Sequence, residues 1–428
     1  MAQQLYFSRD SKMFIEFDGV VWEVPVLDGF SFSQATNSTE ITLNEMESTG
    51  GVSRRGRRAF NDSLAPGEWS FSTYVRPFKS STTGTGKADS AAEVHAVEEV
   101  LWALFAGAKN YDVSTFDYDT GGTNVITPGT SSSTINLGSS NSSTLGTANV
   151  YFVLGSDNRK VMKLKDVTVN EASVDFDIDG IATINWSGSA SEVLDFTGST
   201  HEDNTAPVHS DTTQDGGTIA IGDVWLDAND SYRLYVLTNV TNGSEARTVY
   251  RDEAVLATNN FIRNRLTVLS VTPTTRDPDS DGANELEANY SLTLTGGNVT
   301  FTNNISYITP EELGIVNVPI GHVTGTRSVS GSFTCYLTED TSATNASADF
   351  FDDVRGITNV VTNSFALVFK IGGASGTPRL ELNMPTCHIE IPTHSVEDVI
   401  SLETNFMALP TTIAGTDEAT IIYHGAVV

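Results

Sequence analysis

The residue types best suited to catalysis are few and scattered along this chain. Seven histidines occur in 428 residues, and none forms part of a His-Glu-x-x-His motif. We also find no Gly-x-Ser-x-Gly elbow, no phosphate-binding loop and no Cys-x-x-Cys pair. The one adjacent pair of reactive types is Cys387-His388, and neighbours in a strand face opposite sides. The sequence therefore predicts no catalytic residue, no cofactor and a protein that is not an enzyme.

The acidic segment 277–285 offers the one candidate metal site. Asp277, Asp279 and Asp281 alternate and are followed by a glycine, as an EF-hand loop begins. The twelfth position is Ala288, where such a loop needs a bidentate Glu, and strand-like runs replace the flanking helices. A solvated turn is the favoured interpretation, with a calcium site as the alternative.

Carboxylates also alternate in the strand-like run 175–179. Asp175, Asp177 and Asp179 fall on one face of a strand, and Phe176 and Ile178 fall on the other. Two interpretations stay open. The face is either an ordinary exposed sheet surface or a channel wall, whose fixed negative charge would keep DNA from adhering as it passes.

Four arginines form the only strong basic cluster in a chain with 24 basic residues. They are Arg54, Arg55, Arg57 and Arg58. Guanidinium groups match carboxylates well, so docking onto the acidic surface of a neighbouring copy is favoured. A merely solvated loop is the second interpretation. Nucleic-acid contact is the third, since four arginines gain little on a polyanion in a chain of net charge -30.

Length and composition limit the protein class. A chain of 428 residues exceeds what one core supports, so two domains with insertions are expected. Two cysteines exclude a disulfide framework. The start lacks a basic segment followed by an apolar stretch, and no apolar run is long enough to cross a bilayer. We therefore expect neither a signal peptide nor a membrane contact, and a product that stays in the cytosol where it is made.

Local patterns predict a β-rich chain with two helices. The segments 13–17 and 20–24 flank Asp18-Gly19, which favours a two-residue hairpin. Ser90 can cap a helix that runs to Phe105 with one apolar face. A shorter helix is expected at 347–354.

Two polar stretches divide the chain. Residues 112–149 are rich in Ser, Thr, Gly and Asn, which predicts a long loop or weak hairpin inserted on the surface. A second polar stretch begins at residue 198, and the strand-like runs after it have no counterpart earlier in the chain. We expect a first domain at 1–197, a linker with an extra β element at 198–271, and a second domain at 272–428.

The two domains repeat one order of elements. A strand, a long loop, a strand, a helix and closing strands occur in both, and Glu397 stands where Asp175 stands in the first. The matched segments are 29–32 with 299–302, 69–74 with 331–336, and 173–186 with 395–406. The predicted fold class is mainly β, with two tandem β-barrel or β-sandwich domains.

These features resemble the tail tube proteins, or major tail proteins, of tailed bacteriophages. The segments that carry the resemblance are 27–32, the arginine-rich loop, 68–77 and 324–334. The resemblance implies that each unit adds strands to a continuous barrel around a channel, with one outer α-helix per unit. It also implies that a long loop, here 52–64, reaches into the adjacent ring. The second unit has only 314–323 at that place.

The resemblance further implies the assembly. Such rings contain six barrel units, so three chains with two units each would form a pseudo-hexameric trimer. Six chains would be needed if only one unit entered the barrel. In either ring, the residues expected to face the lumen are Asp175, Asp177, Asp179 and Glu397.

The implied function is structural: stacked rings that form an acidic channel for genome ejection from the virion tail. Assembly would take place in the host bacterial cytoplasm. The implied partners are other copies, the tape measure, the tail terminator, the baseplate or tip, a sheath in a contractile tail, and double-stranded DNA in passage. The alternatives are a tail-tip or adhesin-like β-sandwich that binds a host surface, and a polysaccharide hydrolase with a paired carboxylate.

Overall fold

The chain forms a mainly β structure, which we analysed as a computed structural model. The structure describes residues 5–41, 58–79, 93–113, 115–137, 144–203, 213–214, 217–218, 220–237, 246–247, 249–250, 257–278, 282–313, 317–340, 345–356, 364–373, 378–413 and 415–425. Within these residues, neither helix has the length and apolar character needed to cross a bilayer.

The first hairpin confirms the sequence prediction. Strand β1 (Lys12–Phe17) pairs with β2 (Val20–Glu23), and Phe17 lies opposite Val20. Asp18 and Gly19 both adopt positive φ angles, of 48° and 73°. Because Asp and Gly tolerate this conformation, the turn matches the twist of the two strands.

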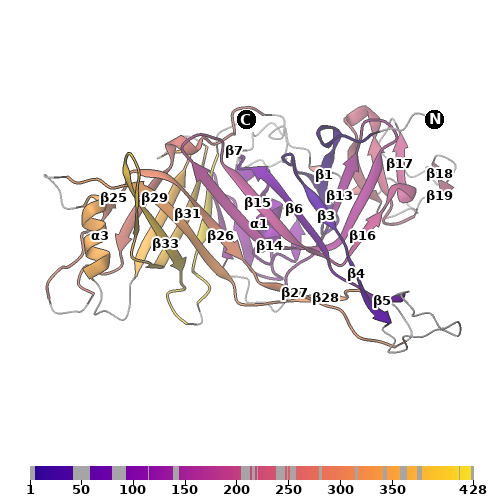
Figure 1. The fold of residues 1–428 in the computed structure, drawn as a ribbon. Helices are drawn as coiled ribbons and strands as arrows, with labels where there is room; N and C mark the ends of the chain where they lie inside the picture. Colours follow the sequence, from indigo (N-terminus) through magenta and orange to yellow (C-terminus); the bar gives the residue numbers. More distant parts are fainter. Residues whose placement is uncertain are drawn as a thin grey trace.

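One long antiparallel sheet runs through the molecule, and we call it the long sheet (Figure 1). Its strand order is β3–β6–β15–β14–β26–β29–β33–β32. The strands are β3 (Ser31–Ser33), β6 (Gly67–Tyr74), β15 (Thr183–Ala190), β14 (Lys160–Asp177), β26 (Leu294–Thr302), β29 (Ser328–Tyr336), β33 (Ile400–Ala408) and β32 (Thr393–Val396).

Two segments of the chain share one scheme of strand pairing. In the first segment, residues 12–195, the order is β2–β1–β13–β14–β15–β6–β3, with β16 also on β14. In the second segment, residues 268–424, it is β25–β24–β30–β31–β33–β29–β26, with β34 also on β31. The added strands are β13 (Ala148–Leu154), β16 (Glu192–Asp195), β24 (Val268–Pro273), β25 (Tyr290–Ser291), β30 (Phe365–Ile371), β31 (Arg379–Ile389) and β34 (Thr420–His424).

A hairpin and a helix occupy the same places in both segments. The hairpin β4 (Thr36–Ile41) and β5 (Arg58–Leu64) connects β3 to β6, and β27 (Ile305–Ile308) and β28 (Gly321–Thr324) connect β26 to β29. Helix α1 (Glu99–Phe105) lies between β6 and β13, and α3 (Ser347–Gly356) lies between β29 and β30. The two segments meet where β14 pairs with β26.

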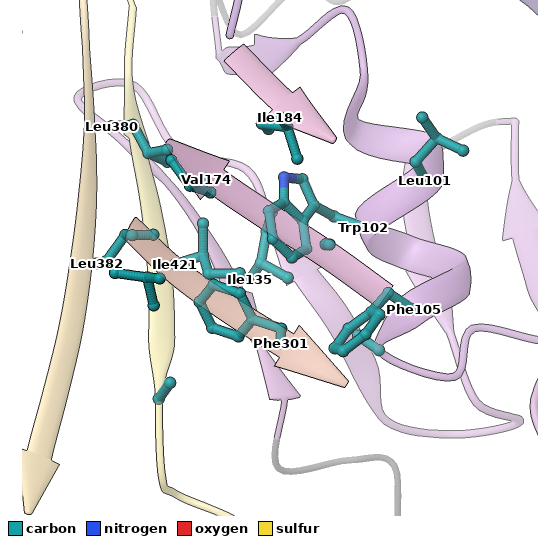
Figure 2. Close-up of a cluster of buried hydrophobic side chains, with 14 of the residues drawn as sticks. Leu101, Trp102, Phe105, Ile135, Val174, Ile184, Phe301, Leu380, Leu382 and Ile421 are labelled. Atoms are coloured by element: carbon teal, nitrogen blue, oxygen red, sulfur yellow. The ribbon is translucent and has the colours of Figure 1, made fainter. Parts of the chain in front are cut away.

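The core lies behind the long sheet and is continuous across the two segments. Trp102 of α1 packs against Trp186 of β15 at 4.8 Å and Phe301 of β26 at 5.4 Å between ring centroids. Figure 2 shows Trp102 and Phe301 together with aliphatic side chains from both segments, such as Ile184 and Ile421. Since all of these side chains are buried, the two segments share one apolar interior.

The first helix differs from the prediction at its start and in its surroundings. Residues 94–96 form strand β8, which pairs with β7 (Pro77–Lys79), so α1 begins only at Glu99. Ser90 lies outside the described residues. All residues of α1 are buried, because the helix packs against strands of the long sheet. The outer position expected for this helix in a ring stays a prediction. Helix α3 begins at the predicted Ser347 and ends two residues later than expected, at Gly356. It buries Phe350 and Val354, while Asp352 and Arg355 are exposed.

Of the two forms expected for 112–149, the hairpin is confirmed in part, since residues 124–127 pair with 133–136, but the long surface loop is wrong. The segment contains β10 (Asp117–Asp119), β11 (Asn124–Thr127) and β12 (Ser133–Asn136), preceded by β9 (Asn110–Asp112). The short apolar pairs in these strands are fully buried, and β12 pairs with the C-terminal strand β34. The edge of β34, from the far end of the chain, therefore pairs with this segment and holds it against the core.

A small sheet follows the first segment. It contains β17 (Thr200–Asp203), β20 (Val224–Asp227), β21 (Arg233–Leu237) and β22 (Ala246–Arg247). Its buried aliphatic side chains pack on Phe14 and Tyr151 of the first segment. Nearby are β18 (Thr213–Gln214), β19 (Gly217–Thr218) and β23 (Val249–Tyr250), the last of which pairs with β2. Strand β24 starts before the expected domain boundary at 272.

Candidate functional site: a polar sheet face

One face of the long sheet carries polar side chains except at Met407, and we call it the polar face. Alternation along each strand turns apolar side chains to the core and small polar ones outward. Its side chains are Ser31, Ser33, Glu68, Ser70, Ser72, Tyr74, Glu171, Ser173, Asp175, Asp177, Thr183, Asn185, Ser187, Ser189, Asn298, Thr300, Thr302, Ser328, Ser330, Ser332, Thr334, Tyr336, Ser401, Glu403, Asn405 and Met407.

Side-chain hydrogen bonds cross the strands of this face. Ser72 donates to Asn185 at 2.6 Å between β6 and β15. Ser173 and Thr300 lie 3.1 Å apart across the joint between the two segments. Ser332 donates to Asn298 at 3.2 Å within the second segment. Such cross-strand pairs fix the register of the sheet, so the face is one ordered surface.

The charge of the polar face is of one sign. Its ionisable carboxylates are Glu68, Glu171, Asp175, Asp177 and Glu403, and none of the described side chains above is Lys or Arg. Because no cation neutralises these carboxylates on the face itself, the face presents a negative potential to whatever lies in front of it.

Asp175 and Glu171 are the two half-buried carboxylates of this face, and Asp175 is the one whose pKa burial shifts. Burial raises its pKa, and hydrogen bonds from Ser173 and Asn185 oppose that shift. These donors are neutral, so they hold the carboxylate in place without cancelling its charge.

The sequence placed part of this acidic surface correctly. Asp175 and Asp177 lie on one face of β14, as expected. Asp179 follows the end of the strand and is exposed in a bend, and Ile178 is 41% exposed rather than facing the core. Strand β14 ends at Asp177, which stops the alternation. Glu397 is exposed in the turn between β32 and β33.

Three acidic residues of the face escaped the sequence analysis. Glu68, Glu171 and Glu403 lie in separate strands and come together only through the pairing of β6, β15, β14, β26, β29 and β33. The alternation of polar and apolar residues around each of them was the sequence signal that could have placed them on this face.

Two shallow hollows in the face contain one carboxylate each. The first is lined by Ser31, Ser70 and Ser187, with Glu68 as its carboxylate. The second is lined by side chains of β26, β29 and β33, with Glu390 as its carboxylate. Glycoside hydrolysis in most families needs a pair of carboxylates across the bond. Neither hollow offers such a pair.

The remaining predicted sites are described only in part. Arg54, Arg55 and Arg57 lie outside the described residues, and Arg58 is exposed at the start of β5. The structure thus leaves the arginine cluster as a prediction.

The acidic loop is described at Asp277, while Asp279 and Asp281 lie outside the described residues. The Asp277 carboxylate accepts a hydrogen bond of 2.9 Å from the backbone N–H of Gly282. Nowhere in the described ranges do three His, Cys, Asp or Glu side chains gather as a metal site requires. Burial raises the pKa of Cys387 to about 12, while His388 is exposed, so these neighbours face opposite sides.

A buried polar group ties the C-terminal strand to α1. Tyr423 of β34 donates to Glu98 at 2.8 Å and accepts from the indole N–H of Trp102 at 2.7 Å. The backbone N–H of Arg76 also donates to Glu98. Burial raises the pKa of Glu98 to about 7, although these hydrogen bonds oppose the shift. The network therefore joins both segments through a carboxyl group that titrates near neutrality.

Comparison with known proteins identifies a relative. No family model matches the chain. The tail tube protein pb6 of Escherichia phage T5 is 27% identical over 401 residues, which cover 92% of this chain and 69% of pb6. This similarity supports a structural role in a phage tail tube. The resemblance found in the sequence is thereby confirmed, and the chain is a relative of the phage tail tube proteins.

Proposed function

We propose that this protein builds the tube of a phage tail and that its two segments are two tube units. One observation supports this above the others. The segments share a single pairing scheme and are already joined edge to edge through β14 and β26 in the long sheet. The joint between β14 and β26 is thus an example, within one chain, of the strand pairing that would connect two chains.

The ends of the long sheet supply that contact. In the described part of the chain, β3 pairs only with β6, and β32 pairs only with β33. All four residues of β32 are exposed. Open edges of this kind pair readily with other chains. Joining β3 of one copy to β32 of the next would extend the sheet and, on closure, leave no free edge.

Three copies would give six units around the ring, and we favour this pseudo-hexameric trimer. A ring of six chains is the alternative if one segment stays outside the barrel. Each interface should exceed roughly 2,000 Å², as obligate assemblies do.

The polar face would line the channel. Its carboxylates repel a polyanion. Its other described side chains are mostly hydroxyls, with no Lys or Arg that could bind a phosphate. Double-stranded DNA could therefore pass during genome ejection without adhering. This role needs neither a catalytic residue nor a cofactor.

The arginine cluster would connect stacked rings, because its guanidinium groups match the acidic surface of another copy. Other tail proteins would bind the two ends of the tube. The site of action would be the virion tail, after assembly in the host bacterial cytoplasm.

Electron microscopy of the purified protein in negative stain tests this proposal. Rings or tubes with a central pore are expected. Isolated particles that bind glycans would favour a tail-tip or adhesin-like protein instead, and sugar release from polysaccharide would favour a hydrolase.

A further inference from the structure

The two equivalent hairpins differ in how well they are covered. We call β4–β5 arm 1 and β27–β28 arm 2. In arm 1, residues 36–40 and 58–62 are exposed on both faces. In arm 2, Tyr307 is half-buried and His322 is buried. A two-stranded hairpin alone is at best marginally stable in water. Among the described residues, arm 2 has a cover and arm 1 has none over residues 36–40 and 58–62.

The cover of arm 2 is the first segment of its own chain. Asn303, at the base of arm 2, donates to the carbonyl oxygens of Phe105 at 2.9 Å and Val169 at 3.3 Å. The backbone N–H of Ile305 donates to the side chain of Asn170 at 2.8 Å. Arm 2 is therefore attached to the middle of β14, at Val169 and Asn170.

The side chains of arm 2 complete this attachment. The Tyr307 hydroxyl donates to the carbonyl oxygen of Asp166 at 2.6 Å and lies 3.3 Å from that of Ser189. The ring of His322 accepts a hydrogen bond of 2.9 Å from the backbone N–H of Leu145. Figure 1 shows arm 2 passing beneath the first segment toward arm 1.

The second segment has an equivalent surface. In the first segment, Val169 lies opposite Gly188 where β14 meets β15; in the second, Cys387 lies opposite Ala408 where β31 meets β33. Leu409 then stands where Ser189 stands in the first segment. In the isolated chain, Leu409 is 38% exposed and the neighbouring Met407 is 51% exposed. We call the surface formed by residues 386–388 and 407–409 the open cradle.

We propose that the paired strands of arm 1 lie in the open cradle of a neighbouring copy within the same ring, while the arginine cluster between the two strands keeps its proposed role in connecting stacked rings. This inference rests on the proposed function. The joint between β14 and β26 places arm 2 across the first segment, because arm 2 leaves the sheet directly after β26. Arm 1 leaves directly after β3, so the same joint between copies places it across the second segment of the neighbour.

The chemistry of the two surfaces agrees with this placement. Phe60 of arm 1 is 61% exposed, and the open cradle offers Leu409 and Met407. Burial of these apolar side chains against each other would be favourable. The counterpart surface of the first segment carries Ser187 and Ser189 instead.

The arms also touch one another within the chain. The backbone N–H of Leu64 in arm 1 donates to the carbonyl oxygen of Asn317 at 2.8 Å, and that of Asn317 donates to Asp62 at 3.3 Å. The connection between the strands of arm 2 therefore rests on the base of arm 1. Repeated from copy to copy, these contacts would form a belt of arms around the ring.

A cysteine pair tests the placement. Counted from the first residue of each hairpin, Ser38 stands in arm 1 where Tyr307 stands in arm 2. The double variant Ser38→Cys, Leu409→Cys, treated after assembly with a short bismaleimide, should yield a covalently closed set of chains equal in number to the ring symmetry. Both substituted residues are exposed, and the native Cys335 and Cys387 are buried, so background linkage should be low.

Two controls make the outcomes distinct. The wild-type protein and the variant Ser38→Cys, Asp352→Cys, whose second cysteine lies on the outer helix α3, should give no closed product. Tubes that form but yield only single chains, or a ladder longer than one ring, would overturn the inference while the proposed function stands. A chain that stays monomeric would overturn both.

Discussion

The carboxyl group of Glu98 should make the stability of this protein depend on pH in an unusual direction. Burial raises its pKa from 4.5 to about 7 in the folded chain. The folded state therefore keeps a proton that the unfolded state releases. Because the unfolded state then binds fewer protons, stability falls as pH rises through this window, and the loss is complete above the folded pKa.

The size of the effect follows from the shift. One pKa unit corresponds to about 1.4 kcal/mol, so the shift from 4.5 to about 7 represents about 3 kcal/mol. Measurements must stay above the pI near 4.4, where the protein carries no net charge. Between pH 5.5 and pH 8, Glu98 should lower the free energy of unfolding by about 2 kcal/mol.

The variant Glu98→Gln isolates the contribution of Glu98 to this pH dependence, because glutamine keeps the shape of the side chain and does not titrate. Urea unfolding of the unassembled chain gives the free energy of unfolding at both pH values. From pH 5.5 to pH 8, the free energy of unfolding of the variant should rise by about 2 kcal/mol relative to that of the wild type. Glu68→Gln, an exposed site, serves as the control. A difference that does not change with pH would refute the argument.

Three further changes test other parts of the structure. Replacing the four arginines within 54–58 with serine should leave rings but prevent their stacking; tubes of normal length would contradict this role. Changing Asp175 and Asp177 to lysine should slow DNA ejection from virions carrying the variant while assembly continues, and normal ejection speed would count against an acidic channel. Trp102→Ala should lower the free energy of unfolding by about 3 to 5 kcal/mol, since it removes a fully buried ring and a partner of Tyr423; a loss below about 1 kcal/mol would show that the shared core matters little.

Local signals explain which elements the sequence predicted. The hairpin at Asp18-Gly19 depends on two residues that accept positive φ, so it can be recognised without the rest of the chain. Helix α3 likewise shows its apolar residues at helical spacing. Such elements need no partner to be recognised.

Nonlocal pairing explains the failures. Val94 and Val97 fit a helical period, but strand β7 was available to pair with residues 94–96. Residues 124–136 look like a polar loop until β34, almost 300 residues later, provides an edge for β12. The carboxylates of the polar face show the same limit, because Glu68 and Glu403 come to share a face with Asp175 only through strand order.

The symmetry of the assembled ring tests the central claim most directly. An averaged top view from electron microscopy, extended to a density map, should show three chains and six similar β units around a pore lined by the polar face. A compact monomer, or a ring whose pore is lined by some other surface, would contradict the account.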